Sequence, residues 1–267
     1  MSLGSCNHYD HVIARSLSVG PLIRQGVCSP YLVRIKRDIA DIAADPPSGI
    51  YIAATDDDIA TIDAMVIGPA DTPYEGGFFR FLIACPTTYP NDPPSVRFLT
   101  TDGGKVQMHP RLYMNGYVSL DIIDGERGWS PAQSLSSLFV SLRSLFTVVP
   151  LCDALHAVRG QLDHSAQCYA QFVRHECVRV AVCDAVESCL QDSPLFPKAF
   201  KETVLRKFLE FYGKYEKALK EQRHLNGSEM CDLIGGTKGN FRHDMLLARL
   251  QDIRERIVKR NNTVLCV

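Results

Sequence analysis

The sequence predicts an α+β protein built around one four-stranded antiparallel sheet. The regular pattern opens with an amphipathic helix, and four short strand-like runs follow it with only turn-rich segments between them. Every later periodic segment is helical. Because short loops join the consecutive strands, we expect the strands to form an antiparallel meander. Helices before and after a single sheet are typical of the α+β class.

The first helix and the four strands follow from local spacing. Ser29 and Pro30 are a typical N-cap and first-turn pair, and apolar residues then recur with the helical period up to Asp45. Runs rich in β-branched and aromatic residues come next, separated by the turn-rich segments DTPYEGG and TTYPNDPP. These runs predict strands at 50–54, 62–67, 78–84 and 96–99.

The second half of the chain is predicted to be helical. Ser130 and Pro131 indicate the start of a helix with an apolar stripe, which continues to Phe146. A long helix is expected near 164–190, and the tail adds two more at 197–221 and 241–259. Because both tail helices carry an apolar stripe, we expect them to dock on the main domain or on each other.

Composition limits the class of protein. With 267 residues and 46% hydrophobic content, the chain can bury a sizeable core without disulfides or metals. No apolar run is long enough to span a membrane, and the N-terminal MSLGSCNHYDHV lacks the pattern of a signal peptide. The ten cysteines are irregularly spaced, and none forms a CxxC pair. We therefore expect reduced, mostly buried thiols and a cytoplasmic or nuclear location, with no membrane partner.

Charge and metal-ligand spacing argue against two further classes of function. Residues 195–267 hold 15 Lys and Arg against 9 Asp and Glu, but these charges are spread between apolar helical positions, so nucleic-acid binding is not expected. His164, Cys168 and His175 share a helical face, yet the last two lie about 10 Å apart along the axis. They are interpreted as packing residues, and neither a metal nor a cofactor is expected.

Several motifs, taken jointly, carry a resemblance to a known family. PYEGGFF, YPNDPPSVRF, the His-Pro pair at 109 and 110, NGYVSLDII and WSPAQS follow one another in the order and spacing of a ubiquitin-conjugating (UBC) enzyme domain. SPYLVRIKRDI, RHECVRVAVCDAVES and the helical tail further resemble the Z subfamily. The resemblance implies a UBC fold over residues 27–190, an irregular arm at 1–26 and a helical extension at 191–267.

In the family pattern the position of Ser119 is that of a cysteine, which carries ubiquitin as a thioester. A thiol suits this reaction because part of it ionises near neutral pH and its acyl ester reacts readily with amines. Ser119 therefore implies a catalytically impaired member of the family. Two alternatives are an active Z-type enzyme with an engineered Cys-to-Ser change, and a hydrolase that uses Ser119 itself.

The resemblance also assigns roles around Ser119. Arg111 stands where the family has an asparagine that steadies the oxyanion, and loss of such a donor commonly costs ~10²-fold in rate. His109 is expected to be structural, because no Ser-His-Asp spacing surrounds Ser119. Asp153 is the candidate for an acidic group that orients the incoming lysine. Asp121 is expected either to shape the site or to cap the turn that follows.

The expected partners are those of the family: ubiquitin or a ubiquitin-like modifier, the activating enzyme, and a ubiquitin ligase or another conjugating enzyme. The resemblance implies partner contacts through the first helix and through two loops. The candidate residues are Arg34, Lys36 and Arg37 on the helix, and Asn91, Trp129, Pro131 and Ala132 in the loops.

Overall fold

The computed structural model describes residues 29–54, 58–124, 128–150, 162–191 and 196–265. A first helix, α1 (Pro30–Ala44), is followed by β1 (Ile50–Ala54), β2 (Thr61–Ile67), β3 (Phe78–Ala84) and β4 (Ser95–Phe98). The strands pair in the order β1-β2-β3-β4, and each pair is antiparallel. The predicted α+β class and meander are confirmed, with β2 and β4 each beginning one residue before its predicted bounds. None of the described helices combines the length and apolar character that a membrane span requires.

Both faces of the sheet are buried, and they face different cores. On β2, Ile62, Ala64 and Val66 belong to one apolar cluster, which we call the first core, together with residues of α1. Met65 and Ile67 on the same strand belong to a second cluster, the second core, formed with helices from the C-terminal part of the chain. Because side chains alternate across a strand, the one sequence TIDAMVI supplies both cores.

Helix α3 (Leu135–Ser144) covers the first core, and it begins later than predicted. Its N-cap is Ser134, whose hydroxyl accepts from the Ser137 N–H while the Ser137 hydroxyl accepts from the Ser134 N–H. Ser130 lies in the preceding turn, where its N–H donates to Oε1 of Gln133 at 2.8 Å, so the predicted start at Ser130 was wrong. The short helix α2 (Asp121–Asp124), which was not predicted, precedes this turn.

The helix predicted near 164–190 is continuous but changes type. It consists of α4 (Leu162–Glu176), a π-helical segment (Cys177–Asp184) and α5 (Ala185–Leu190). Within the π-helical segment, Cys177 and Ala181 belong to the first core, whereas Val182 and Cys183 belong to the second core. A π turn holds more residues than an α turn, so the directions of the side chains around the helix axis shift along this segment. The segment thereby contributes side chains to both cores.

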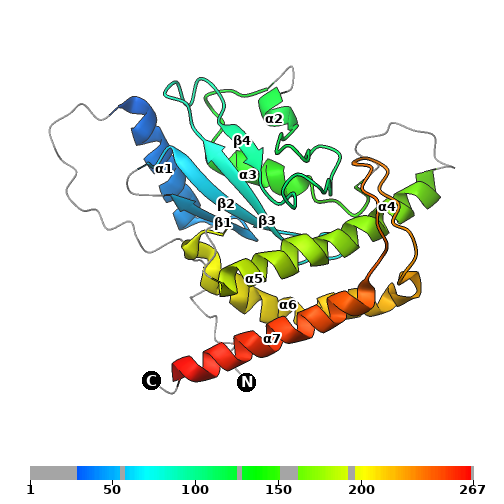
Figure 1. Cartoon of the computed structure of the whole chain (residues 1–267). Coiled ribbons are helices and arrows are strands. Elements are labelled where there is room, and N and C mark those ends of the chain that lie inside the picture. The colour runs from blue at the N-terminus through cyan, green and yellow to red at the C-terminus, as the bar shows by residue number, and fades with distance from the viewer. Residues whose placement is uncertain (1–28, 55–57, 125–127, 151–161, 192–195, 266–267) are drawn as a thin grey trace, which may run out of the picture.

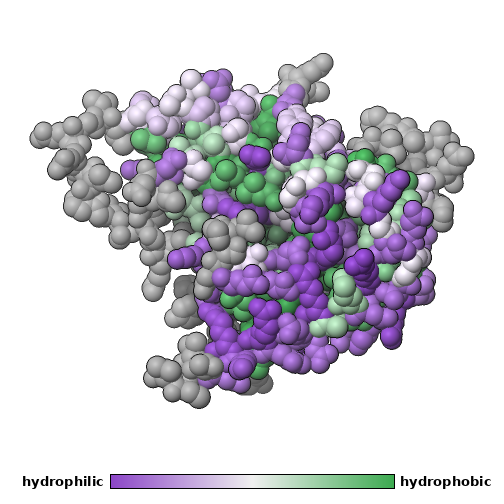
Figure 2. All heavy atoms as spheres, viewed as in Figure 1, coloured by the Kyte–Doolittle hydropathy of each residue, from purple (hydrophilic) through white to green (hydrophobic). Residues whose placement is uncertain are grey.

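The C-terminal extension closes the second core. A 3-10 turn (Lys198–Phe200) leads into α6 (Lys201–Glu221), a second 3-10 turn (Arg223–Leu225) follows, and α7 (His243–Leu265) ends the described chain. Figure 1 shows α6 and α7 side by side below the sheet, and Figure 2 shows mainly polar side chains on the outer surface of this part. The apolar stripes are turned inward, as predicted.

Polar contacts fix the extension in place. The Tyr215 hydroxyl donates to the carbonyl of Gly76 at 2.8 Å, which attaches α6 to the turn before β3. Arg249 on α7 forms ion pairs with Asp184 at 2.6 Å and Glu187 at 2.7 Å. The N–H of Arg242 donates to Nε2 of buried His175 at 3.1 Å, where α7 begins. The predicted docking of the tail helices is therefore confirmed.

Candidate functional site

Ser119 lies in a small antiparallel turn that follows the sheet. Leu112 and Val118 are bridge partners and both are buried. The Ser119 N–H donates to the Arg111 carbonyl at 2.9 Å, which places these two residues opposite each other. Because side chains alternate, the burial of Leu112 and Val118 turns Arg111 and half-buried Ser119 to the outer face.

Two exposed tyrosines share this outer face. Tyr113 and Tyr117 are 41% and 51% exposed, and their ring centroids lie 5.5 Å apart. The Tyr117 hydroxyl donates to Oδ2 of Asp124 at 3.1 Å, and the same oxygen accepts from the Leu120 N–H at 3.1 Å. This carboxylate therefore holds the backbone directly after Ser119.

Arg111 is paired across the Ser119 position. Its Nη1 donates to Oδ1 of Asp121 at 2.9 Å. Asp121 is the first residue of α2 and is highly exposed, whereas Arg111 is half-buried. A guanidinium held by a carboxylate has fewer free donors and a smaller net field than a free one. The sequence left the role of Asp121 open between the site and the following turn. The register that sets 111 opposite 119 is the signal that could have decided it.

His109 is fully buried and neutral. Its Nδ1 accepts from the Arg111 N–H at 3.0 Å. The pKa of His109 is lowered to about 4, mainly by burial and also by the nearby Arg111 cation, while a hydrogen bond with the Leu145 backbone opposes the shift. A ring nitrogen that already accepts from the backbone is not free to take a proton from Ser119. Among the described residues, His109 makes a side-chain hydrogen bond with the Arg111 backbone, and no hydrogen bond joins it to Ser119.

The predicted contact residues of α1 differ in their surroundings. Lys36 and Arg37 are exposed. Arg34 points inward, where Nε donates to Oδ1 of Asp38 at 2.8 Å and Nη1 donates to the Pro131 carbonyl at 2.9 Å. Arg34 also donates to the Gln133 carbonyl. Its guanidinium therefore binds the loop before α3 and is largely occupied within the chain.

The two predicted loops lie next to each other. Nε1 of Trp129 donates to the Pro90 carbonyl at 2.7 Å, and the indole packs against the first core. This contact brings Asn91 close to the loop that carries Pro131 and Ala132, and all three of these residues are exposed. Asp153 lies outside the described residues.

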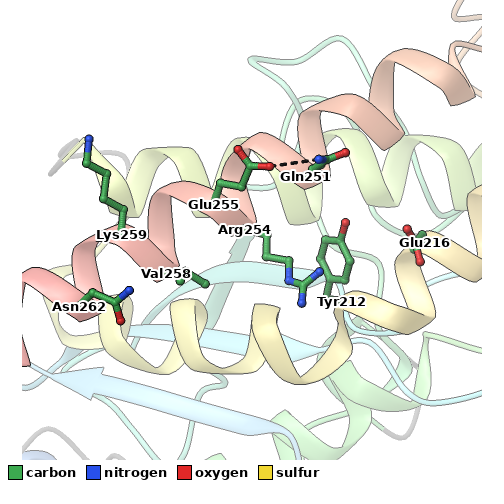
Figure 3. A pocket seen from close by; sticks show the side chains of 8 residues that line it. All are labelled: Tyr212, Glu216, Gln251, Arg254, Glu255, Val258, Lys259 and Asn262. Carbon is green, nitrogen blue, oxygen red and sulfur yellow. Dashed lines mark hydrogen bonds between the residues drawn. The ribbon is translucent and has the colours of Figure 1, made fainter.

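A groove elsewhere on the surface contains none of these residues. It lies between α6 and α7, has a volume of about 870 Å³ and is shown in Figure 3. Arg254 lies over the Tyr212 ring at 4.7 Å, and Gln251 donates to Glu255 at 3.0 Å. Both contacts lie within the extension, so the groove is separate from the Ser119 turn.

A meander that leads into a supported turn and then into α3 is the arrangement of a UBC domain, and residues 34–176 match the sequence model of the family described as ubiquitin-conjugating enzyme. The chain belongs to this family. It is 40% identical over 228 residues to ubiquitin-conjugating enzyme E2 Z of Xenopus tropicalis, which covers 85% of this chain and 72% of the relative. The identity to the Homo sapiens E2 Z is also 40%, over 232 residues that cover 86% of this chain and 64% of the relative.

The similarity to E2 Z extends beyond a single conjugating domain. Ubiquitin-conjugating enzyme E2 2 of Saccharomyces cerevisiae is 39% identical over 118 residues, which cover 44% of this chain and 64% of the relative. The E2 Z matches cover about twice that share of the chain. The two E2 Z proteins are themselves longer than this chain, which spans 64% to 72% of their length.

Proposed function

We propose that this chain is a catalytically impaired ubiquitin-conjugating-enzyme-like protein in which Ser119 replaces the thioester-forming cysteine. The observation that carries the proposal is the pairing of Arg111 with Asp121 beside Ser119. Arg111 stands in place of the family's asparagine, which is a second departure from the family pattern beside the missing thiol, and its guanidinium is held by Asp121. Both changes affect the same reaction, because the thiol accepts the acyl group and the asparagine steadies the charge that develops on it.

The chemistry of a hydroxyl explains the impairment. A serine hydroxyl ionises far less than a thiol near neutral pH, and its acyl ester reacts less readily with amines. A neighbouring base can activate a serine, but His109 is buried and its Nδ1 is occupied by the Arg111 N–H. These facts argue against the hydrolase alternative as well as against efficient ubiquitin transfer.

The proposed role is that of a binding scaffold in the ubiquitin or ubiquitin-like modifier pathway. The partners that we propose are a modifier, the activating enzyme, and a ligase or another conjugating enzyme. Lys36 and Arg37 on α1 and the adjoining loops with Asn91, Pro131 and Ala132 are exposed, which supports their use as contact surfaces. A cytoplasmic or nuclear location, a conjugating domain at 27–190 and an extension at 191–267 belong to the same proposal.

A second candidate function is that of an active Z-type conjugating enzyme with an engineered Cys-to-Ser change. The observation that favours it is the 40% identity to E2 Z relatives over most of the chain. The natural codon at position 119 separates the two candidates, because a cysteine codon supports the enzyme and a serine codon supports the scaffold.

The test is a charging assay with activating enzyme, ATP and ubiquitin. The unmodified chain should give no reductant-sensitive adduct at Ser119 and at most a slow ester that resists reductant. Ser119→Cys should restore a reductant-sensitive thioester if the partner surfaces are intact. Ser119→Ala is the matched control and should abolish the slow ester too.

The contribution of Arg111 is measured on the Ser119→Cys background. Adding Arg111→Asn should speed discharge to lysine at least ~10-fold, because an amide donor replaces an ion-paired guanidinium. Adding Asp121→Ala is the control that frees Arg111 from its ion pair without supplying an amide. A robust thioester on the unmodified chain, mapped to any of its cysteines, would refute the impaired-enzyme proposal.

A further inference from the structure

One face of α7 forms a wall of the groove between α6 and α7 (Figure 3). Tyr212 and Glu216 on α6 form the opposite wall. The lining residues of α7 recur every three or four positions: Gln251, Arg254, Glu255, Val258, Lys259 and Asn262. This spacing keeps side chains on one face of a helix, and a rise of about 1.5 Å per residue gives the face a length of ~16 Å. The groove is therefore long enough for about three helical turns of a bound peptide.

Arg254 presents an unpaired cation in this groove. Its guanidinium carbon lies 4.7 Å from the centroid of the Tyr212 ring. Tyr212 in turn packs against the second core, with its ring centroid 6.0 Å from that of buried Phe208. Among the residues that the structure describes, none accepts a hydrogen bond from Arg254 or forms an ion pair with it. Because the N–H donors of a stacked guanidinium lie in its own plane, they stay free to bind a ligand from the side.

The carboxylates that line the groove are already engaged. Glu216 forms an ion pair with Lys220 at 3.2 Å. Glu255 accepts from the side-chain amide of Gln251 at 3.0 Å. Neither of them neutralises Arg254, so the unmatched charge of the groove is positive.

Apolar surface lies beside this cation. Val258 follows Arg254 by one helical turn and is 44% exposed. The half-buried ring of Tyr212 adds aromatic surface on the opposite wall. A groove of this kind is complementary to a segment that carries a carboxylate next to an apolar side chain.

We propose that the groove between α6 and α7 docks an acidic, partly apolar peptide segment of a partner protein. A carboxylate of the segment binds the guanidinium of Arg254, whose parallel N–H donors match the two carboxylate oxygens. An apolar side chain of the segment covers Val258 and the Tyr212 ring. The groove is separate from the Ser119 turn, so this inference does not rest on the proposed loss of conjugating activity.

The lining favours a peptide over nucleic acid, which is also an acidic polymer. Glu216 and Glu255 lie in the same groove as Arg254 and would repel a continuous run of phosphates. A peptide can place one carboxylate at Arg254 and uncharged side chains elsewhere along the groove. Exposed Val258 also offers an apolar contact that a phosphate backbone would not use.

The probe is a phage-displayed library of random peptides of about 15 residues, long enough to cover the groove as a helix. The library is first depleted on the Arg254→Gln variant and is then selected on the immobilised full chain. We expect enriched peptides that combine Asp or Glu with apolar residues. In fluorescence anisotropy the most enriched peptide, labelled with fluorescein, should bind Arg254→Gln at least ~10-fold more weakly than it binds the parent.

Variants of the same helix are the controls. Arg256→Gln removes a cation that is 41% exposed and pairs with Asp252 outside the groove, so it should leave the affinity unchanged. Val258→Ser should weaken binding, because it removes apolar surface. All three substitutions are at exposed positions, and equal melting temperatures would show that the fold is kept.

Four results would overturn the proposal. They are the absence of any peptide enriched on the parent over Arg254→Gln, enriched peptides without acidic residues, and equal losses of affinity in Arg254→Gln and Arg256→Gln. The fourth is a single-stranded DNA oligonucleotide that binds more tightly than the peptide and depends on Arg254, since that would assign the groove to nucleic acid.

Discussion

Acidification should destabilise the fold through His109, and the structure sets the size of the effect. His109 is 0% exposed, and its pKa is lowered from 6.5 to about 4, first by burial and then by the Arg111 cation. The unfolded chain therefore takes up a proton at a higher pH than the folded chain does. The stabilisation is complete above pH 6.5, is lost as the pH falls from 6.5 towards 4, and declines no further below pH 4.

The magnitude follows from the two pKa values. Between pH 7 and pH 5 the folded state should lose about 2 kcal/mol through His109 alone, and at pH 4 about 3 kcal/mol. His109→Asn removes the titrating group but keeps an acceptor near the Nδ1 position for the Arg111 N–H. The variant should be less stable at pH 7, because it leaves a cavity, but its stability should depend less on pH.

The assay is urea unfolding of the full chain and of His109→Asn at pH 7 and pH 5. The difference in free energy of unfolding between the two pH values should be smaller in the variant by about 2 kcal/mol. Tyr74→Phe is a matched control, since it removes the buried hydrogen bond from the Tyr74 hydroxyl to the Met108 carbonyl, 2.8 Å long, without removing an imidazole. An equal pH dependence in the parent and in His109→Asn would refute the argument.

Two further predictions concern the extension. Burial, and then the neighbouring His175, lower the pKa of His243 to about 4. His243→Asn should therefore also reduce the loss of stability between pH 7 and pH 5 in urea unfolding. An equal loss in the parent and in the variant would contradict this prediction. Phe208 is fully buried in the second core, so Phe208→Ala should cost about 3–5 kcal/mol and should speed hydrogen exchange in both α6 and α7. Faster exchange confined to α6 would show that the two helices are not stabilised by a shared core.

Local periodicity was enough to predict the strands and most helices. The alternation in TIDAMVI and the helical spacing in α1 are properties of short segments, so they can be read without knowing the fold. The start of α3 could not be read in this way, because Ser130 and Ser134 are both capable caps. The choice is made by distant groups: Asp38 accepts from the Leu135 N–H at 3.2 Å, and Arg34 binds the carbonyl of Pro131.

The motifs alone also indicated the family, which the comparisons confirmed, and they located the turn around Ser119. They could not show that Arg111 pairs with Asp121 or that Arg34 faces inward. Each of these contacts joins side chains whose separation is set by packing between elements, and no local pattern encodes that distance. The sequence by itself thus determined the elements and the family. The tertiary structure decided which charged groups pair with one another, because burial and pairing arise only when the two cores close.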